Sequence, residues 1–363
     1  MFVVLDTNIL YSDFHLRGAE IESLCQSINK IGGKVCIPEI VIRETINKYR
    51  EELSASKKMI DKGLNTYSRL SGQSVFNNPI TEEQTDSDVI AFKNYHRQRV
   101  RELGIDVLPI PSISHEEVIA RDLARKKPFT IEGKGYRDTL IWETMRELCG
   151  RVEDPLDKPI VVMVNKNYKD FCVDTAYELH PDLRNDLVAK GLRDDCVRVV
   201  SDISRVMKEY IKPTQELLQG VIDKFNEYKF YNEVDLNREV EERTTRFLQD
   251  RTFDLEENPL RPEFENPTIT DVELMKYEVT DARVLTEESV QVDLSVKCQC
   301  YFDFYIYKAD AVILDEDEMP TIIDPDWNRH YMAACDARML SLSMSLIIDR
   351  KFTQVLSESI SID

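Results

Sequence analysis

Short apolar runs alternate with helix-forming stretches along the first 200 residues. Apolar residues recur at every third or fourth position in residues 18–31, which is typical of an amphipathic helix, and Gly32 and Gly33 end this pattern. Apolar runs of strand length occupy residues 2–5, 35–37, 107–110, 159–164 and 197–200. Because strands that alternate with helices form parallel sheets, this half of the chain is predicted to be α/β.

The region after the second strand departs from simple alternation. Pro38 opens a helix predicted over residues 40–53, with Glu44 in its first turns. Residues 54–104 have the pattern of helical hairpins with a loop near residues 71–79. This segment is therefore predicted to be an insertion or a lid.

Two later segments carry signals for helix starts. Ser114 and Glu117 have the spacing of a capping box, in which each side chain bonds the backbone of the other. Residues 133–135, Gly-Lys-Gly, precede a helix whose first residues include Asp138. Both helices are predicted to belong to the α/β domain.

The second half of the chain changes its hydrophobic period. Residues 201–258 are helical in pattern, and three prolines mark a boundary after them, at positions 259, 262 and 267. Apolar residues then alternate with polar ones over 290–306 and 340–348, which is typical of antiparallel strands with one face in water. The run 290–306 is longer than a usual strand, so a bulge or bend is predicted within it.

These patterns predict the fold class and the domains. The fold class is α/β, with an N-terminal parallel sheet flanked by helices, a helical linker region, and a C-terminal antiparallel β-rich (α+β) domain. The predicted limits are 1–205 for the α/β domain, with 54–104 as its helical insertion, 206–260 for the helical connector, and 261–363 for the acidic β-rich domain.

Charge separates the two halves. The chain of 363 residues has a net charge of −20, but residues 1–200 hold 29 Lys and Arg against 32 Asp and Glu. Residues 201–363 hold 18 against 35, so the acidic half is expected to repel nucleic acid.

The eight cysteines form no CxxC pair and mostly lie in apolar segments, which suits reduced, buried thiols. Since the sequence shows neither a membrane-spanning run nor a signal peptide, we expect no membrane partner and a cytoplasmic location.

Acidic and polar side chains follow the predicted strands at matching places. Asp6 ends the first strand, Glu44 and Asp138 lie in the first turns of helices, and Asn167 and Asp170 follow the strand 159–164. In a parallel sheet these positions converge at one edge. Carboxylates gathered there repel one another unless a hard divalent cation, Mg²⁺ or Mn²⁺, binds between them. Such a site can orient water and stabilise charge on a phosphodiester.

Four segments in this order resemble the motifs of PIN-domain nucleases, in a subgroup with an extended chain and an additional C-terminal domain. They are Asp6-Thr7-Asn8, Glu44 in residues 41–44, Asp138 in residues 135–142, and Asn167 with Asp170 in residues 164–171. The resemblance covers roughly residues 1–200. It implies a metal-dependent endonuclease that usually acts on RNA, and a setting such as a toxin or a defence against mobile elements.

The resemblance also implies roles for individual residues. Asp6, Glu44 and Asp138 are implied as metal ligands or water-positioning catalytic acids, with Thr7 and Asn8 holding Asp6. Many family members carry an acid where this chain has Asn167. Asn167 is a candidate metal ligand through its amide oxygen, which has no charge and is therefore predicted to weaken a second metal site, and Asp170 is a candidate for the fourth catalytic carboxylate.

Basic residues near these acids are candidates for substrate contact. A basic segment adjoins Asp138 and is predicted to contact phosphates, together with a lysine after the strand 159–164. The residues are Arg121, Lys126, Lys127, Lys134, Arg137 and Lys166. A second basic stretch over residues 93–101 suits a solvated helix face equally well. The partner predicted is RNA, with DNA as an alternative, and the acidic C-terminal domain is predicted to bind a protein or a second copy.

Other interpretations of the same residues remain open. Asp6 and Asp138 each suit a helix N-cap or the positive end of a helix, and Glu44 suits a solvated helix face. Asn167 and the acidic C-terminal half are also consistent with a non-catalytic module that binds nucleic acid or a partner. A DNA nuclease acting on flaps or single strands is a further alternative.

Overall fold

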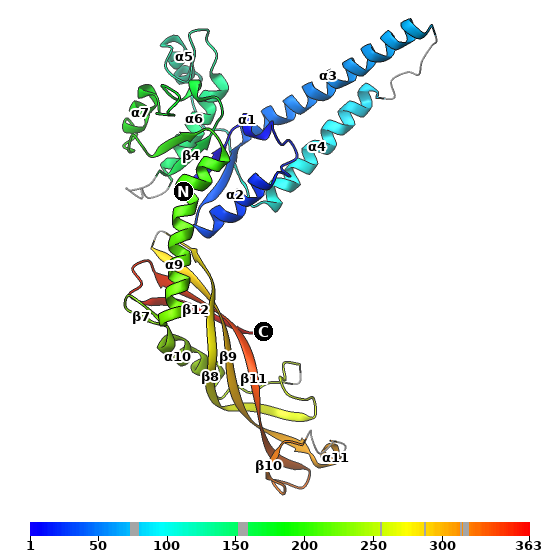
Figure 1. Ribbon diagram of the computed structural model, residues 1–363, viewed down its shortest axis with the longest axis vertical. Coiled ribbons are helices and arrows are strands. Elements are labelled where there is room, and N and C mark those ends of the chain that lie inside the picture. Colours follow the sequence, from blue (N-terminus) through cyan, green and yellow to red (C-terminus); the bar gives the residue numbers. More distant parts are fainter. Residues whose placement is uncertain (73–79, 152–158, 255, 287, 313, 315–318) are drawn as a thin grey trace. The chain divides into compact units, whose positions relative to one another are not determined.

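A computed structural model describes residues 1–72, 80–151, 159–254, 256–286, 288–312, 314 and 319–363 (Figure 1). The chain divides into two compact units, Met1–Thr214 and Gln215–Asp363. The three-part division predicted from the sequence, with limits at 205 and 260, stays a prediction.

The N-terminal unit is built on a five-stranded sheet in the order β3-β2-β1-β4-β5. Every neighbouring pair in this sheet is parallel, so the predicted parallel α/β architecture is confirmed. Each strand overlaps one of the five predicted apolar runs: β1 Phe2–Leu5, β2 Lys34–Pro38, β3 Asp106–Leu108, β4 Val161–Val164 and β5 Val197–Val200.

Helices follow the strands in the alternation that the sequence predicts. They are α1 Thr7–Leu10, α2 Ala19–Lys30, α3 Glu39–Ser71, α4 Glu82–Glu102, α5 His115–Leu123, α6 Tyr136–Cys149, the 3-10 turn η1 Tyr168–Asp170, α7 Pro181–Val188, α8 Ile203–Val206, the π-helical η2 Met207–Ile211 and α9 Lys212–Tyr228. All four residues of β4 are buried, as expected for a strand covered on both faces. Trp142 of α6 is fully buried in the same core.

The helix after β2 is longer than predicted. Instead of ending near residue 53, α3 continues unbroken for 33 residues and projects from the sheet with α4 beside it (Figure 1). Residues 54–71 therefore continue the helix that begins at Glu39, and together with α4 they form the helical hairpin predicted within 54–104. The buried residues of α3 are Val41, Ile42 and Thr45, so none of them lies in the continuation 54–71. The predicted loop near 71–79 lies mostly outside the described residues.

Helix starts confirm the predicted capping signals. Ser114 accepts a hydrogen bond from the Glu117 backbone, and the Glu117 side chain accepts one from the Ser114 backbone, which completes the capping box of α5. Gly135 precedes α6 with a φ of 136°. A Cβ atom there would lie 2.7 Å from both the Phe129 Cα and the Pro128 carbonyl oxygen, so only glycine fits this approach.

The C-terminal unit is an antiparallel sheet with helices, as predicted. Its strand order is β10-β11-β9-β8, and β12 also pairs with β11. The elements after α9 are β6 Phe230–Tyr231, β7 Val234–Asp235, α10 Leu236–Leu248, β8 Phe264–Val284, β9 Ser289–Tyr307, α11 Lys308–Ala311, β10 Thr321–Asp324, β11 Tyr331–Asp349 and β12 Val355–Ile362.

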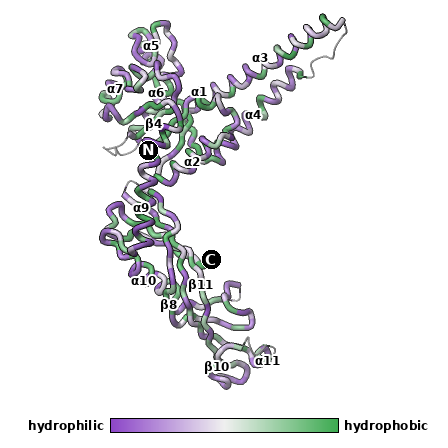
Figure 2. The backbone as a smooth tube through the Cα atoms, viewed as in Figure 1, coloured by the Kyte–Doolittle hydropathy of each residue, from purple (hydrophilic) through white to green (hydrophobic). Residues whose placement is uncertain are grey.

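Burial alternates along the long strands of this sheet. Even-numbered residues of β9 are buried from Val290 to Ile306, and the hydropathy of the strands varies residue by residue (Figure 2). The bulge predicted within 290–306 is absent from the described pairing of β9 with β11, which runs in continuous register from Ser289 to Tyr307. The irregularities lie in the partner β8, whose pairing with β9 shifts at four places. The edge strand absorbs the extra residues because it has a partner on one side only.

Two bulk predictions can be compared with this structure. Seven of the eight cysteines are buried as free thiols, and Cys335 is half-buried. Within the part of the chain that the structure describes, no helix combines the length and apolar character needed to cross a bilayer.

Candidate active site at the carboxyl edge of the parallel sheet

The strand order creates a crevice beside Asp6. After β1 the chain adds β2 and β3 on one side of it, whereas β4 pairs with the other side of β1 and is followed outward by β5. This reversal of strand order between β1 and β4 is a topological switch point, where open α/β sheets bind ligands. Asp6 follows β1 directly, and Asn165 follows β4. The Asp6 backbone N–H donates to the Val164 carbonyl at 3.2 Å, which joins the ends of the two strands.

Asn8 holds the Asp6 side chain in this crevice. The Asn8 amide nitrogen donates to Asp6 Oδ2 at 2.7 Å and to Asn165 Oδ1 at 2.6 Å. The Asn8 amide oxygen accepts from the Lys166 backbone N–H at 3.0 Å. Asp6 occupies the N-cap position of α1, yet within the described residues its side chain makes no capping hydrogen bond. Its carboxylate therefore serves this network rather than the helix end.

The carboxyl groups at this edge influence one another. The pKa of Asp6 is raised to about 7, mainly by burial and to a smaller extent by the charges of Asp138, Glu44 and Asp170, while a hydrogen bond from the Thr7 backbone opposes the shift. Burial, followed by the charges of Asp170 and Glu44, raises the pKa of Asp138 to about 6. Burial also raises the pKa of Asp170, while Lys127 opposes that shift. The structure thus brings the predicted acids into mutual repulsion.

Glu44 is turned toward other partners. Its Oε2 accepts a hydrogen bond from Thr7 Oγ1 at 3.0 Å, and its Oε1 forms an ion pair with Arg137. The Thr7 hydroxyl therefore bonds Glu44, while the Thr7 backbone N–H bonds the Asp6 carboxylate. Arg137 offsets part of the negative charge at this edge, since it lowers the pKa of Asp138 while Glu44 raises it.

The turn after β4 contains a residue that the sequence analysis missed. Asn165 is buried, and its Oδ1 accepts from Asn8 and from the Asn167 backbone N–H, each at 2.6 Å. Asn167 is exposed, and its amide nitrogen donates to Asp170 Oδ2. Asn167 thus orients the carboxylate of Asp170. The signal for Asn165 was its position directly after the strongest strand, which is equivalent to the position of Asp6 after β1.

The oxygen atoms at this edge are of the type that binds a hard cation, but in the described part of the chain the acidic side chains are too far apart for three of them to share one. They are carboxylate and amide oxygens, which Mg²⁺ and Mn²⁺ prefer. Two of the acids have pKa values raised toward neutrality, the expected state of carboxylates that lack a compensating cation. Among the residues described, however, no group of three or more His, Cys, Asp or Glu side chains is close enough to hold a metal ion together.

Two of the predicted phosphate-contacting residues have a buried partner instead. Arg121 of α5 forms an ion pair with Asp186 of α7, and only 9% of the Arg121 side chain is exposed. Lys126 Nζ also binds Asp186, at 2.7 Å, and Trp142 Nε1 donates to the same carboxylate at 3.1 Å. These contacts join α5, α6 and α7. The role of Asp186 was not predictable, because ion-pair partners that are distant in the chain leave no local sequence pattern.

The other predicted basic residues have lighter or no side-chain contacts. Lys127 Nζ donates to the Lys169 carbonyl at 2.6 Å, and Lys134 pairs with Glu132 at 2.7 Å in full exposure to solvent. Lys166 is exposed beside the Asn8 network. The charges of Lys127 and Arg137 therefore act on Asp170 and Asp138, respectively, while Lys134 lies on the loop before α6.

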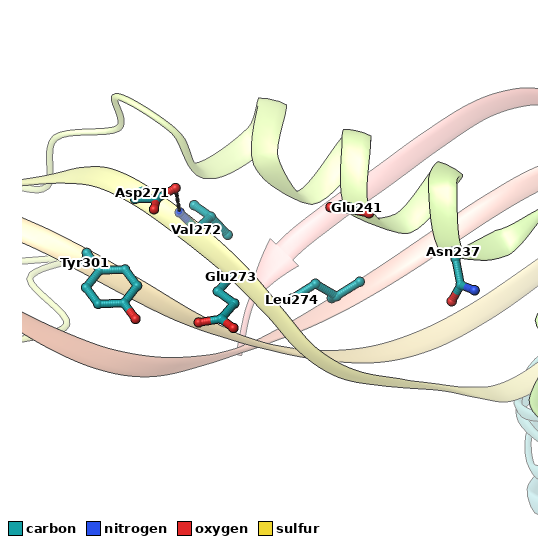
Figure 3. Close-up of a pocket in the computed structure, with 7 residues that line it drawn as sticks. All are labelled: Asn237, Glu241, Asp271, Val272, Glu273, Leu274 and Tyr301. Atoms are coloured by element: carbon teal, nitrogen blue, oxygen red, sulfur yellow. Dashed lines mark hydrogen bonds between the residues drawn. The ribbon is translucent and has the colours of Figure 1, made fainter.

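A second groove lies within the C-terminal unit, between α10 and β8 (Figure 3). It has a volume of about 630 Å³ and is lined in part by Glu241, Asp271 and Glu273. The Asp271 carboxylate accepts from the Val272 backbone N–H at 2.9 Å, as the dashed line shows. Three acids and no cation line this groove among the described residues, so its charge disfavours nucleic acid.

The fold and the edge define a class. A parallel sheet with Asp6, Asp138 and Asp170 gathered at its switch point is the architecture of a nuclease-like α/β domain. Comparison with known families gives the same answer, because residues 3–171 match the family model described as PIN domain. The N-terminal unit therefore contains a PIN-like domain, and the β-rich unit is additional to it. The chain matches no curated protein and no solved structure.

Proposed function

We propose that the protein is a Mg²⁺- or Mn²⁺-dependent endonuclease that hydrolyses phosphodiester bonds in RNA. The observation that carries the proposal is the placement of Asp6 and Asp138, whose pKa values are both raised mainly by burial, at the carboxyl edge of the sheet in a PIN-like domain. Carboxylates held this way are available to bind a cation and to handle a proton near neutral pH.

The residues proposed to hold the cation are Asp6 and Asp138, joined by Glu44 or Asp170. A bound Mg²⁺ or Mn²⁺ would supply Lewis acidity at the phosphate and lower the pKa of water. Asn8 keeps the Asp6 carboxylate oriented, and Asn167 does the same for Asp170.

Arg137 has two proposed roles in this scheme. It pairs with Glu44 in the structure, and 59% of its side chain is exposed. Phosphate and carboxylate are both ligands for a guanidinium group, so an incoming phosphodiester competes with Glu44 for Arg137. Transfer of Arg137 to the substrate would free Glu44 for the cation. Lys127 and Lys166 are proposed to contact neighbouring phosphates.

The test is cleavage of single-stranded RNA, single-stranded DNA and DNA flaps with Mn²⁺, alongside calorimetric titration of Mn²⁺. Wild type is expected to cut RNA, and Asp6→Asn and Asp138→Asn are expected to lose cutting and Mn²⁺ binding together. Glu116→Gln is the matched control, because Glu116 is an exposed carboxylate of α5 outside the crevice. Cutting of DNA alone would replace RNA as the substrate, and cutting that persists in Asp6→Asn would refute the proposed site.

A non-catalytic PIN-like binding module is the second candidate. Its support is the engagement of Glu44 by Arg137 and the absence, in the described part of the chain, of three acids close enough to share a cation. Nucleic-acid binding that needs no metal and is unchanged in Asp138→Asn, with no cleavage of any substrate, would favour this candidate.

A further inference from the structure

A basic groove lies between α3 and α4 and beside the edge strand β3. It has a volume of about 640 Å³. Cationic side chains line both helices along it: Arg43 and Arg50 of α3, and Lys93, Arg97 and Arg101 of α4. The acid in the lining is Glu39.

Most of these cations have no counter-charge. Arg43 pairs with Glu39 at 2.8 Å. The remaining four cations, Arg50, Lys93, Arg97 and Arg101, are exposed and form no ion pair within the residues that the structure describes. A local excess of positive charge is unusual on a chain with a net charge of −20, and it attracts polyanions selectively.

The spacing of the cations on α4 points to a polymer. Lys93, Arg97 and Arg101 are each four residues apart, so they lie on one helical face at intervals of about 6 Å. Repeated charges at regular intervals match a chain of phosphates better than a single small anion. Apart from His96, the residues that line the groove include no aromatic ring, so the groove offers no platform for base stacking.

The groove is separate from the carboxylate crevice but shares a helix with it. Glu39, Arg43 and Arg50 lie on one face of α3 at helical spacing, whereas Glu44 points to Thr7 and Arg137. A strand held along the groove therefore runs beside the first turns of the helix that carries Glu44.

We propose that this groove binds the sugar-phosphate backbone of a single RNA strand, without sequence preference, and holds it at a distance from the bond that is cut. The proposal rests on the proposed nuclease function for the identity of the polymer. Arg50, Lys93, Arg97 and Arg101 provide the phosphate contacts, and the aliphatic floor, including Ile90 and Val107, contacts ribose.

The test measures binding of a short oligouridine by fluorescence anisotropy in EDTA, so that cleavage plays no part. Lys93→Glu with Arg97→Glu is compared with Lys58→Glu with Lys62→Glu, which makes the same charge change at exposed positions of α3 outside the groove. The groove variant is expected to bind at least about tenfold more weakly, and its slope of log K against log salt is expected to fall by about 1.4, for two lost phosphate contacts at about 0.7 each. The control is expected to keep the wild-type slope. The neutral pair Lys93→Gln with Arg97→Gln repeats the test without introducing repulsion.

The outcomes separate this proposal from the proposed function. Cleavage by wild type together with unchanged affinity in both groove variants overturns the groove and leaves the nuclease intact. Loss of affinity in the groove variants of a protein that cuts nothing supports the groove and refutes the nuclease. Tight binding of polyglutamate that oligouridine does not displace would identify an acidic protein segment as the occupant and overturn the proposal.

Discussion

At the residue scale, the carboxyl group of Asp6 shows how position sets chemistry. The side chain is 8% exposed and hydrogen-bonded to Asn8, yet its pKa is raised to about 7 by burial and by three neighbouring acids. Because the folded state disfavours the charged form of Asp6, ionisation of this carboxyl group lowers the free energy of unfolding. The same property makes it a ligand for a cation.

Asp6→Asn is expected to stabilise the cation-free protein at alkaline pH. Because the folded pKa lies above the ordinary value of 3.8, the folded state binds the proton more tightly, and the stability that this contributes is lost as pH rises through about 7. The gain in Asp6→Asn is on the order of 3 kcal/mol near pH 8 and vanishes below about pH 4. Urea denaturation in EDTA at both pH values measures it. An equal loss of stability at both would contradict the prediction.

Arg137→Gln is expected to raise the affinity for Mn²⁺ and to lower the affinity for RNA. Removal of the guanidinium frees Glu44 and removes a cation that lowers the pKa of Asp138. Since Arg137 is largely exposed, solvent screens the pair, and the change in Mn²⁺ affinity is a few fold, or up to about 1 kcal/mol. Calorimetric titration checks this value. Weaker Mn²⁺ binding would show that Arg137 does not restrain Glu44.

Gly135→Ala is expected to destabilise the protein by about 3 kcal/mol or more. The new Cβ would lie 2.7 Å from backbone atoms, at a φ of 136°. Gly104→Ala is the matched control, because Gly104 has a φ of 65° but nothing within 4 Å of its Cβ position. Its cost is expected to be about 1 kcal/mol. Thermal unfolding compares the two, and equal losses would mean that the close approach to Phe129 carries no cost.

At the element scale, long-range contacts decide how the helices around the site are fixed. Asp186 of α7 binds Arg121 and Lys126 and accepts a hydrogen bond from Trp142 of α6. Since α6 also carries Asp138 in its first turn, this cluster fixes one wall of the crevice. Two of the cations that proximity to Asp138 suggested for substrate contact thus serve the packing of helices.

Asp186→Asn is expected to destabilise the protein by about 3–5 kcal/mol, because it leaves the buried Arg121 without its counter-charge. Asp122→Asn is the matched control, since Asp122 pairs with Arg125 of the same region in an exposed setting. Loss of that pair is expected to cost less than about 1 kcal/mol. Chemical denaturation measures both variants, and a similar small cost in each would show that the cluster does not fix the wall.

At the scale of the whole molecule, the two compact units differ in net charge as well as in fold. Residues 1–214 hold 32 Lys and Arg against 34 Asp and Glu, whereas residues 215–363 hold 15 against 33. The second unit therefore has a net charge of −18, and its like charges repel one another in the folded state.

Calorimetry is expected to show two unfolding transitions with different responses to salt. Raising NaCl from low to moderate concentration screens the repulsion in the acidic unit and raises its Tm, while the near-neutral unit changes less. Asp186→Asn assigns the transitions, because it lowers only that of Met1–Thr214. Equal salt shifts in both transitions would mean that the charge difference does not govern stability.

Local sequence determined much of this protein. The buried run at Val161–Val164, the capping box of Ser114 and the alternation along β9 each specify structure through neighbours in the chain, so the elements and the two kinds of sheet were predictable. The order of Asp6, Glu44 and Asp138 along strands and helices was likewise enough to indicate a PIN-like domain.

The tertiary structure alone decided which side chains meet. Three contacts join segments that are far apart in the sequence. Asn165 bonds Asn8 as well as its neighbour Asn167, Glu44 pairs with Arg137, and Arg121 pairs with Asp186. The length of α3 and the bulges of β8 also departed from prediction, since neighbouring elements and not local propensity set where a helix ends or an edge strand slips. Sequence periodicity records which face of an element is buried, but hydrogen bonds and ion pairs depend on distances that only packing fixes.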